Sequence, residues 1–273
     1  MDVSLIITTY NWPEALRLTL GSVLNQSKLP NEVIVADDGS GPETARIVQS
    51  VMKKSTLRWC HVRHADTGVR QSRIKNLAVK YSKFPYLVLI DHDVMLHPEF
   101  IADHISMSEG GVFLQGKRAL LSGPLTQEII ERGSFSLSGI QRGRLKNKKN
   151  TYRLPKLGRL FSRTKRFEKS LRGCNLSMYR SDFLGVDGFD ETFDLSWGRE
   201  DSDICYRLFH RGVRVKNLWF LALQYHLHHK VSENWDKERL DRELDQVVQE
   251  KRTKAILGFS KLSSEGGIVA ESD

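Results

Sequence analysis

The sequence predicts an α/β fold built on a mostly parallel sheet with helices on both of its faces. Short apolar stretches rich in β-branched residues alternate with stretches in which apolar residues recur at helical spacing. The order strand, helix, strand, helix, strand is typical of a doubly wound parallel sheet. Apolar residues make up 40% of the 273 residues and charged residues 27%, so the chain can bury an extended core and wholesale disorder is excluded.

The first half of the sequence carries the regular alternation. Four short apolar stretches are predicted as strands: 3–9, 32–36, 57–62 and 86–90. Three intervening stretches are predicted as helices: 13–24, which Pro13 opens, 43–53, and 68–77. No apolar run approaches the roughly 20 residues that cross a bilayer. No basic residues precede the first apolar stretch, so we expect no secretory signal there.

The second half is less regular. Residues 112–115 and 173–179 are predicted as strands, and 200–210 as a helix that ends before Gly212. Residues 236–256 carry apolar side chains at helical spacing between dense charges, which predicts an amphipathic helix packed on the body of the protein. We divide the chain into four parts: a first half at 1–115, a variable basic segment at 116–172, a second half at 173–235, and the amphipathic helix with its tail at 236–273.

Polar residues follow three of the predicted strands. Thr8 and Tyr10 end the first, Asp38 follows the second, and Asp91 and Asp93 follow the fourth. Ligands of open parallel sheets collect at the carboxyl ends of the strands, so these residues point to a site there. Two carboxylates one residue apart can hold a hard divalent cation and leave positions open for a diphosphate. The alternative for Asp38 is ordinary turn chemistry, because Asp-Gly is a common turn dipeptide.

Two clusters in the second half carry further candidates. An aromatic ring, a glycine and three acids lie together at the predicted helix start, in the segment 197–203. Acids at a helix N-terminus are favourable for the helix dipole, but three are more than a cap requires, and one of them could act as a general base. His226, His228 and His229 are candidate metal ligands; one of them completing the shell of a cation held by aspartate is favoured over a closed zinc site.

The net charge of +9 comes from one segment. Between Arg142 and Arg172 there are thirteen Lys and Arg against the single acid Glu168, a local balance of +12. Such a field attracts anions such as phosphorylated lipid, nucleic acid or a polyanionic substrate, and the alternative is a solvated loop. Three scattered cysteines form neither a disulfide framework nor a zinc pattern, which fits a reducing cytosol.

Taken together, these motifs resemble the family 2 inverting glycosyltransferases of GT-A fold. The opening ITTYN, the turn ADDGS and the sequence DHD, in place of the Asp-x-Asp of that family, occur in order. The later stretch GCNLSMYR, VDGFDETF, WGREDSDICYRL and YHLHH is similar to the carboxyl half of β-1,4-galactosyltransferases and bacterial chondroitin polymerases. The resemblance covers residues 3–113 and 173–229, which implies a nucleotide-sugar-binding half followed by an acceptor-binding and catalytic half.

The resemblance implies roles for the matching residues of the first half. Thr8 and Tyr10 would line the nucleoside pocket, and Asp38 would bind the uracil. Arg73 would lie near the nucleotide, with Arg70 as the alternative. The common Ala-Arg-Asn of the family is Ile-Lys-Asn in this sequence, at residues 74–76, which leaves the cationic contact open.

The resemblance also implies a metal site. Asp91 would hold the ribose or support that site, and Asp93 would ligate Mn²⁺ or Mg²⁺. A histidine completes the shell in the relatives; His226 matches one of them and His229 matches the spacing of another, and we rank His226 first. Asn175 would face the donor sugar.

The implied reaction is a single in-line displacement that inverts the anomeric configuration. Trp197 would stack on the acceptor sugar, Glu200 would bind it, and Asp201 would remove the proton from its hydroxyl group. Arg199 replaces a second glycine of the relatives and is expected to narrow the acceptor pocket. The donor would be a UDP-sugar and the acceptor a saccharide or glycolipid of bacterial-type surface polysaccharide or lipopolysaccharide synthesis.

Two other functions are less consistent with the sequence. A sugar-phosphate nucleotidyltransferase needs a Gly-rich basic first loop, which the sequence Thr-Thr-Tyr-Asn-Trp-Pro lacks. A non-catalytic basic module for polyanions explains residues 142–172 but leaves the acidic strand ends unused, and we expect no nucleic-acid partner. We expect a cytoplasmic enzyme whose basic segment docks on the inner membrane surface or on a phosphorylated acceptor.

Overall fold

The computed structural model describes residues 1–134, 145–167, 173–230 and 236–272. Its strands are β1 (Val3–Thr9), β2 (Glu32–Asp37), β3 (Arg58–Arg63), β4 (Tyr86–Asp91), β5 (Val94–Leu96), β6 (Val112–Gln115), β7 (Arg118–Leu121), β8 (Leu145–Lys146), β9 (Thr164–Lys165), β10 (Asn175–Tyr179), β11 (Arg214–Asn217), β12 (Gln224–His226) and β13 (Gly267–Glu271). Its α-helices are α1 (Pro13–Leu24), α2 (Pro42–Met52), α3 (Gln71–Tyr81), α4 (Phe100–Met107), α5 (Gly123–Arg132), α6 (Pro155–Phe161), α7 (Arg180–Gly185), α8 (Glu200–His210) and α9 (Lys237–Gln249).

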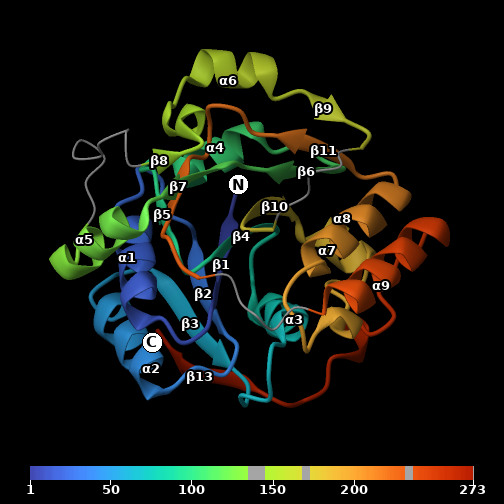
Figure 1. The fold of residues 1–273 in the computed structure, drawn as a ribbon, viewed down its shortest axis with the longest axis horizontal. Helices are drawn as coiled ribbons and strands as arrows, with labels where there is room; N and C mark the ends of the chain where they lie inside the picture. Colours follow the sequence, from blue (N-terminus) through green and yellow to red (C-terminus); the bar gives the residue numbers. More distant parts are fainter. Residues whose placement is uncertain (135–144, 168–172, 231–235, 273) are drawn as a thin grey trace.

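The described strands form two sheets. The larger has the order β13-β3-β2-β1-β4-β10-β6-β11-β9, and the smaller has the order β5-β12-β7-β8. The pairs β1–β2, β2–β3 and β1–β4 are parallel, as predicted for a doubly wound sheet. Strand β10 is antiparallel to both β4 and β6, so the second half of the chain continues the same sheet. The predicted mostly parallel α/β fold is therefore confirmed (Figure 1).

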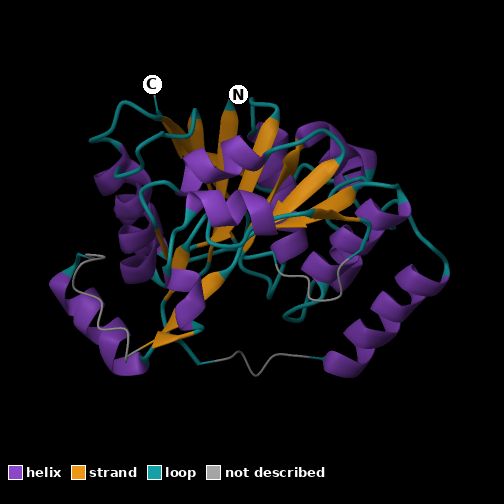
Figure 2. Cartoon of the chain, turned by 90° about the horizontal axis from the view of Figure 1, so that it is seen from above, coloured by secondary structure: helices purple, strands orange, loops and turns teal. Residues whose placement is uncertain are grey.

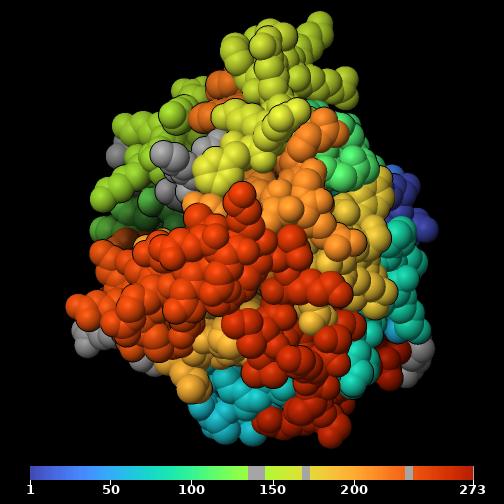
Figure 3. Space-filling model, turned by 90° about the vertical axis from the view of Figure 1, so that its right-hand side faces the viewer, coloured from blue at the N-terminus to red at the C-terminus, as the bar shows by residue number. Residues whose placement is uncertain are grey.

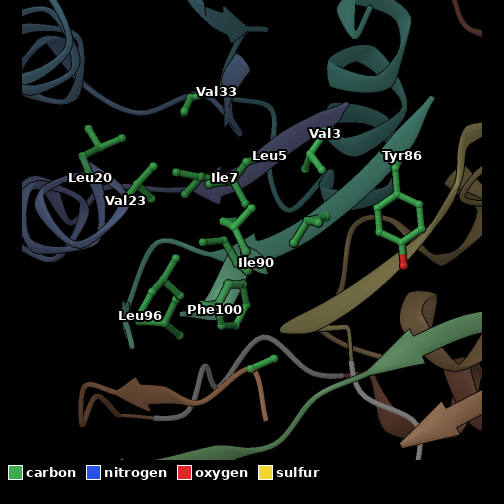
Figure 4. Packing of buried hydrophobic residues seen from close by; sticks show 14 of the residues in the cluster. Val3, Leu5, Ile7, Leu20, Val23, Val33, Tyr86, Ile90, Leu96 and Phe100 are labelled. Atoms are coloured by element: carbon green, nitrogen blue, oxygen red, sulfur yellow. The ribbon is translucent and has the colours of Figure 1, made fainter. Parts of the chain in front are cut away.

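Alternate residues of each central strand face opposite sides of the larger sheet, where two apolar cores lie. On one side Leu5 and Ile7 of β1 pack with Leu20 of α1 and Phe100 of α4, all fully buried (Figure 4). On the other side Ile6 belongs to a core that also includes apolar residues of α3, α7 and α8. Full burial of such a side chain stabilises the fold by about 1.5–3 kcal/mol. The sheet is thus covered by helices on both faces (Figure 2).

The ends of the helices follow local chemistry. Proline occupies the first turn of α1 and of α2, where its fixed φ suits the helix and its missing N–H is not needed. The Oγ of Ser122 accepts a hydrogen bond from the backbone of Leu125 and caps α5, which ends at Gly133 with a φ of +63°.

The C-terminal part of the chain wraps the body. Helix α9 packs on α8 through Leu240 and Val247, as the amphipathic pattern predicted, and it covers one face of the molecule (Figure 3). Strand β13, which was not predicted, then pairs antiparallel with β3 at the edge of the sheet. In the described part of the chain no helix is both long and apolar enough to span a bilayer.

The basic segment is described only in part. Residues 142–144 and 168–172, which contribute to the predicted +12 balance, lie outside the described residues. The rest forms β8, a 3₁₀ turn at Lys148–Thr151, α6 and β9. Strand β9 pairs with β11, and β8 pairs with β7, so both sheets end in this segment.

Candidate active site

A cavity of about 610 Å³ opens at the carboxyl ends of β1 and β4. Its lining combines strand ends of the first half with the helix start and histidines of the second half. The lining residues are Thr8, Thr9, Tyr10, Trp12, Gln71, Asp91, His92, Asp93, Arg118, Trp197, Gly198, Glu200, Asp201, His226, His229 and Lys230. Residue 93 and residue 201, which are 108 positions apart in the sequence, therefore face one cavity.

Asp93 and two histidines form a compact cluster in this cavity. Strand β12 is antiparallel to β5, which places His226 opposite Val94 and next to the turn that carries Asp93. The Oδ2 of Asp93 lies 3.1 Å from Nε2 of His226 and 3.0 Å from Nε2 of His229. One potential ligand atom from each residue lies within 4.8 Å of the others, so the three can hold a metal ion. The cluster includes both histidines that the sequence left as alternatives.

The electrostatics of this cluster favour a charged carboxylate. Burial alone would raise the pKa of Asp93, but the two imidazoles hold that pKa well below its usual range. The Oδ1 of Asp93 is buried without a hydrogen-bond partner among the described residues. A buried, charged oxygen without a partner is costly, and a bound cation would satisfy it. Desolvation and the neighbouring charge of Asp93 raise the pKa of Asp91 to about 7.

A second cluster joins α3 to the start of α8. The Nζ of Lys75 lies 3.0 Å from Oε1 of Glu200 and 3.3 Å from Oδ1 of Asp201. Burial alone would lower the pKa of Lys75, but the charges of Asp201, Glu200 and Asp91 raise it. Burial and the charge of Asp201 raise the pKa of Glu200. The Oδ2 of Asp201 accepts a hydrogen bond of 2.9 Å from the backbone N–H of Gly173, so this carboxylate is held from two sides.

The loop before α8 is strained and is held by α9. Leu195 and Arg199 have φ values of +69° and +74°, in the left-handed region that non-glycine residues rarely adopt. The guanidinium of Arg199 forms an ion pair with Asp241 of α9, at 2.6 Å between Nη2 and Oδ1. Trp197 between these residues lines the cavity, whereas Arg199 does not. The expected narrowing of the pocket by Arg199 is therefore not observed in the cavity lining.

Three predicted site residues lie outside the cavity lining. Asp38 accepts hydrogen bonds of 3.1–3.2 Å from the backbone N–H of Arg70 and is almost fully buried. The guanidinium of Arg73 donates to Ser263 Oγ and to the carbonyl of Glu265, at 2.8 and 2.7 Å, and so fastens the C-terminal segment.

Asn175 is also a buried structural residue. Its Oδ1 accepts a hydrogen bond of 2.9 Å from His104, and its Nδ2 donates one of 3.0 Å to the carbonyl of Ala222. The amide group joins β10 to α4 and to the chain that leads into β12, rather than facing the cavity.

Sequence reasoning missed several lining residues. Trp12 packs edge-on against His229, with ring centroids 6.0 Å apart, and so supports the cluster of Asp93 with the two histidines. Arg118 begins β7, and its buried Nε has no hydrogen-bond partner among the described residues. Lys75, which does not line the cavity but pairs with Glu200 and Asp201, was also missed; its position on the face of α3 that carries Ser72 and Asn76 toward the body was the available signal.

Two family models match separate regions of the chain. Residues 4–120 match the family model "Glycosyl transferase family 2", and residues 159–230 match the model "N-terminal domain of galactosyltransferase". The chain is 28% identical over 236 residues to a hyaluronan synthase of Pasteurella multocida, which covers 80% of this chain and 24% of that protein. It is 28% identical over 246 residues to a chondroitin synthase of Escherichia coli, covering 82% of this chain and 34% of the relative. The chain thus spans about a quarter to a third of the length of these relatives.

Solved structures show the same fold. Staphylococcus aureus TarS 1-349 in complex with UDP-GlcNAc superposes with a TM-score of 0.64 at 16% identity, over 95% of this chain and 69% of that one. The mannosyltransferase PcManGT of Pyrobaculum calidifontis, in complex with GDP-Man and Mn²⁺, gives a TM-score of 0.58 at 17% identity, over 84% and 57%. The chain therefore has the GT-A fold, residues 4–120 match glycosyl transferase family 2, and the chain is similar to glycosyltransferases over about four fifths of its length.

Proposed function

We propose that this chain transfers a hexose or N-acetylhexosamine from a UDP-sugar to a saccharide acceptor, with a divalent metal ion and with inversion. The proposed setting is the synthesis of a bacterial-type surface polysaccharide or lipopolysaccharide. One observation carries the proposal: the cluster Asp93–His226–His229 and the residues Trp197 and Asp201 line the same cavity. A cation site and a carboxylate base facing one cavity is the arrangement that a metal-dependent transfer to a hydroxyl group requires.

Asp93, His226 and His229 would hold the metal ion. A carboxylate with an unpartnered buried oxygen and two imidazoles fits a divalent ion, and the mixed oxygen and nitrogen donors favour Mn²⁺ over Mg²⁺. When bound, the ion supplies a Lewis acid that stabilises charge on the phosphate oxygens of the departing UDP. The guanidinium of Arg118 also lines this cavity, and the described residues provide no carboxylate partner for it. We therefore assign Arg118 to the anionic part of the donor.

Asp201 would act as the general base. Lys75 and the backbone N–H of Gly173 hold its carboxylate in place, so that its free lone pairs are presented to the acceptor. Glu200 would accept a hydrogen bond from another hydroxyl of the acceptor, and Trp197 would offer its ring to the apolar face of the sugar. The acceptor oxygen forms its bond to the anomeric carbon while the bond to UDP breaks on the opposite face, and the proton passes to Asp201. A single displacement of this kind inverts the anomeric configuration.

The relatives support the choice of substrate class. Hyaluronan and chondroitin synthases are among the proteins to which this chain is similar, and the TarS structure holds UDP-GlcNAc. We therefore propose a UDP-sugar as the donor, with Thr8 and Tyr10, which line the cavity, at the nucleoside. The proposed acceptor is a saccharide or glycolipid, and the proposed location is the cytoplasmic face of a membrane with anionic lipids.

A donor screen tests this function. The purified chain is incubated with UDP-sugars, saccharide acceptors and Mn²⁺, and release of UDP is measured, with the Asp201→Asn variant as the blank. We expect acceptor-dependent UDP release that Asp201→Asn lowers by at least a hundredfold. Release of pyrophosphate from a nucleoside triphosphate and sugar phosphate would instead indicate a nucleotidyltransferase. Binding of polyanions with no turnover of any donor would indicate a non-catalytic module.

A further inference from the structure

The described part of the basic segment forms a protruding surface that is both cationic and apolar. Residues 145–167 contain nine Lys and Arg and no acid. Helix α6 and its flanks expose large apolar side chains: Leu154, Leu157, Leu160, Phe161 and Phe167. The side chains of Leu160 and Phe161 are 56% and 55% exposed, which is unusual for large apolar residues that lie side by side. We call residues 154–167 the α6 face; it projects from the rim of the molecule (Figures 1 and 3).

The α6 face is fixed to the body of the protein by backbone contacts. Its apolar residues are therefore exposed in a defined orientation. Gly158 is buried, and a Cβ at this position would lie 2.7 Å from the carbonyl oxygen of Trp219, so only glycine allows the close approach. The backbone N–H of Leu154 donates to the carbonyl of Phe220 at 3.0 Å, and Ser162 Oγ accepts from the backbone of Trp219 at 2.9 Å. The Gly158 edge of the helix therefore faces the body, and Leu157, Leu160 and Phe161 are left about half exposed to water.

The composition of the α6 face selects its partner. Lys156, Arg159, Arg163, Lys165 and Arg166 are all exposed among the apolar side chains. A second copy of the chain docking through the same face would bring two such cationic surfaces together, which Coulomb repulsion opposes. An anionic bilayer offers both complements at once, because its headgroups carry phosphates and its acyl boundary accepts leucine and phenylalanine side chains.

We propose that the α6 face docks this enzyme on an anionic lipid surface. Leu157, Leu160 and Phe161 enter the boundary between headgroups and acyl chains, and Lys156, Arg159 and Arg163 contact the lipid phosphates. The face is joined to the active site, because residues 219–221, on which α6 rests, lead directly into the strand that carries His226. One part of the inference rests on the proposed function: a lipid surface bound by the α6 face would be the place where the enzyme meets a lipid-linked acceptor.

Vesicle co-sedimentation of the full chain tests the proposal. Vesicles of phosphatidylcholine alone are compared with vesicles that contain roughly 30 mol% phosphatidylglycerol, which makes their surface strongly anionic. We expect at least tenfold tighter binding to the anionic vesicles and a marked loss of binding when salt is raised from about 0.1 M to 0.5 M. Binding that is equal on both kinds of vesicle, or absent on both, would overturn the proposal.

Two triple variants separate the two parts of the surface. Lys156→Gln/Arg159→Gln/Arg163→Gln should weaken anionic vesicle binding by roughly a hundredfold, since each basic residue near such a surface contributes about a factor of five. Leu157→Ser/Leu160→Ser/Phe161→Ser should weaken it at least tenfold at both salt concentrations. The matched controls are Lys28→Gln/Lys53→Gln/Lys54→Gln and Leu257→Ser/Val269→Ser, which alter exposed residues elsewhere and should change binding by less than about twofold.

The readouts distinguish this inference from the proposed function. All four variants should keep the wild-type rate of UDP release with a soluble acceptor, because none of the altered residues lines the cavity. A chain that releases no UDP but binds anionic vesicles through the α6 face would refute the proposed function and leave this inference standing. A chain that is active but whose vesicle binding is unaffected by both α6 triple variants would refute the inference alone.

Discussion

Replacing Lys75 by methionine should destabilise the protein because it leaves two carboxylates near each other without their cation. The Nζ of Lys75 lies 3.0 and 3.3 Å from Glu200 and Asp201. At an effective dielectric constant of about 20, each attraction is on the order of 5 kcal/mol before the cost of desolvation is subtracted. Removal of one partner of such a buried pair typically costs about 3–5 kcal/mol, and methionine keeps nearly the same volume. We therefore expect Lys75→Met to lower the free energy of unfolding by about 3–5 kcal/mol.

Urea unfolding followed by tryptophan fluorescence measures this loss. The matched control is Lys54→Met, at an exposed lysine of the same fold, which should change stability by less than about 0.5 kcal/mol. In the Lys75→Met background, Glu200→Gln should recover at least about 1 kcal/mol, because it removes one of the stranded charges. A loss below about 1 kcal/mol for Lys75→Met, or no recovery in the double variant, would refute the electrostatic account of this cluster.

Three further predictions follow from the same geometry. Gly173→Ala should abolish most activity while the chain stays folded, because a Cβ there would overlap the carboxylate of Asp201; near wild-type turnover would contradict the positioning of that base. Burial lowers the pKa of His104 from 6.5 to about 4, so the unfolded chain takes up this proton first as the pH falls, and His104 by itself should lower the stability by about 3 kcal/mol between pH 6.5 and 4. Urea unfolding of wild type and His104→Gln across that range should show a stability difference between the two that changes by about this amount, and a difference that does not change with pH would disprove the assignment. Arg118→Gln should weaken UDP binding about tenfold in calorimetry, as expected for loss of a charge-assisted hydrogen bond, and an unchanged affinity would remove Arg118 from the donor site.

The sequence predicted the sheet and the location of the site because both follow from local patterns. Short apolar strands alternating with helices determine a parallel sheet, and polar residues at strand ends then meet at one edge. Asp91 and Asp93 could be placed in this way from the strand that precedes them. The approach of His226 to Asp93 depends instead on the pairing of β12 with β5, which no local pattern predicted. That step came from the cluster of histidines at 226–229 together with the resemblance to known enzymes.

What the sequence did not reveal are the partners of individual polar side chains. A pattern indicates that Arg73 lies on α3, but only the path of the C-terminal segment shows that Glu265 and Ser263 occupy its guanidinium. The same holds for Asn175, because its side-chain amide oxygen accepts a hydrogen bond from His104, which lies on a helix distant in the sequence. Lys75 was overlooked for the same reason, because its carboxylate partners lie 125 and 126 positions away.

The most direct test of the account is whether UDP binding depends on a divalent metal ion and on Asp93, as measured by calorimetry. The wild-type chain should bind UDP with Mn²⁺ present and at least tenfold more weakly in EDTA. Asp93→Asn should bind UDP weakly under both conditions, whereas Asp201→Asn should keep metal-dependent UDP binding because it acts on the acceptor side. Equal UDP affinity of wild type and Asp93→Asn, with and without Mn²⁺, would contradict a cation held by Asp93, His226 and His229 at the donor diphosphate.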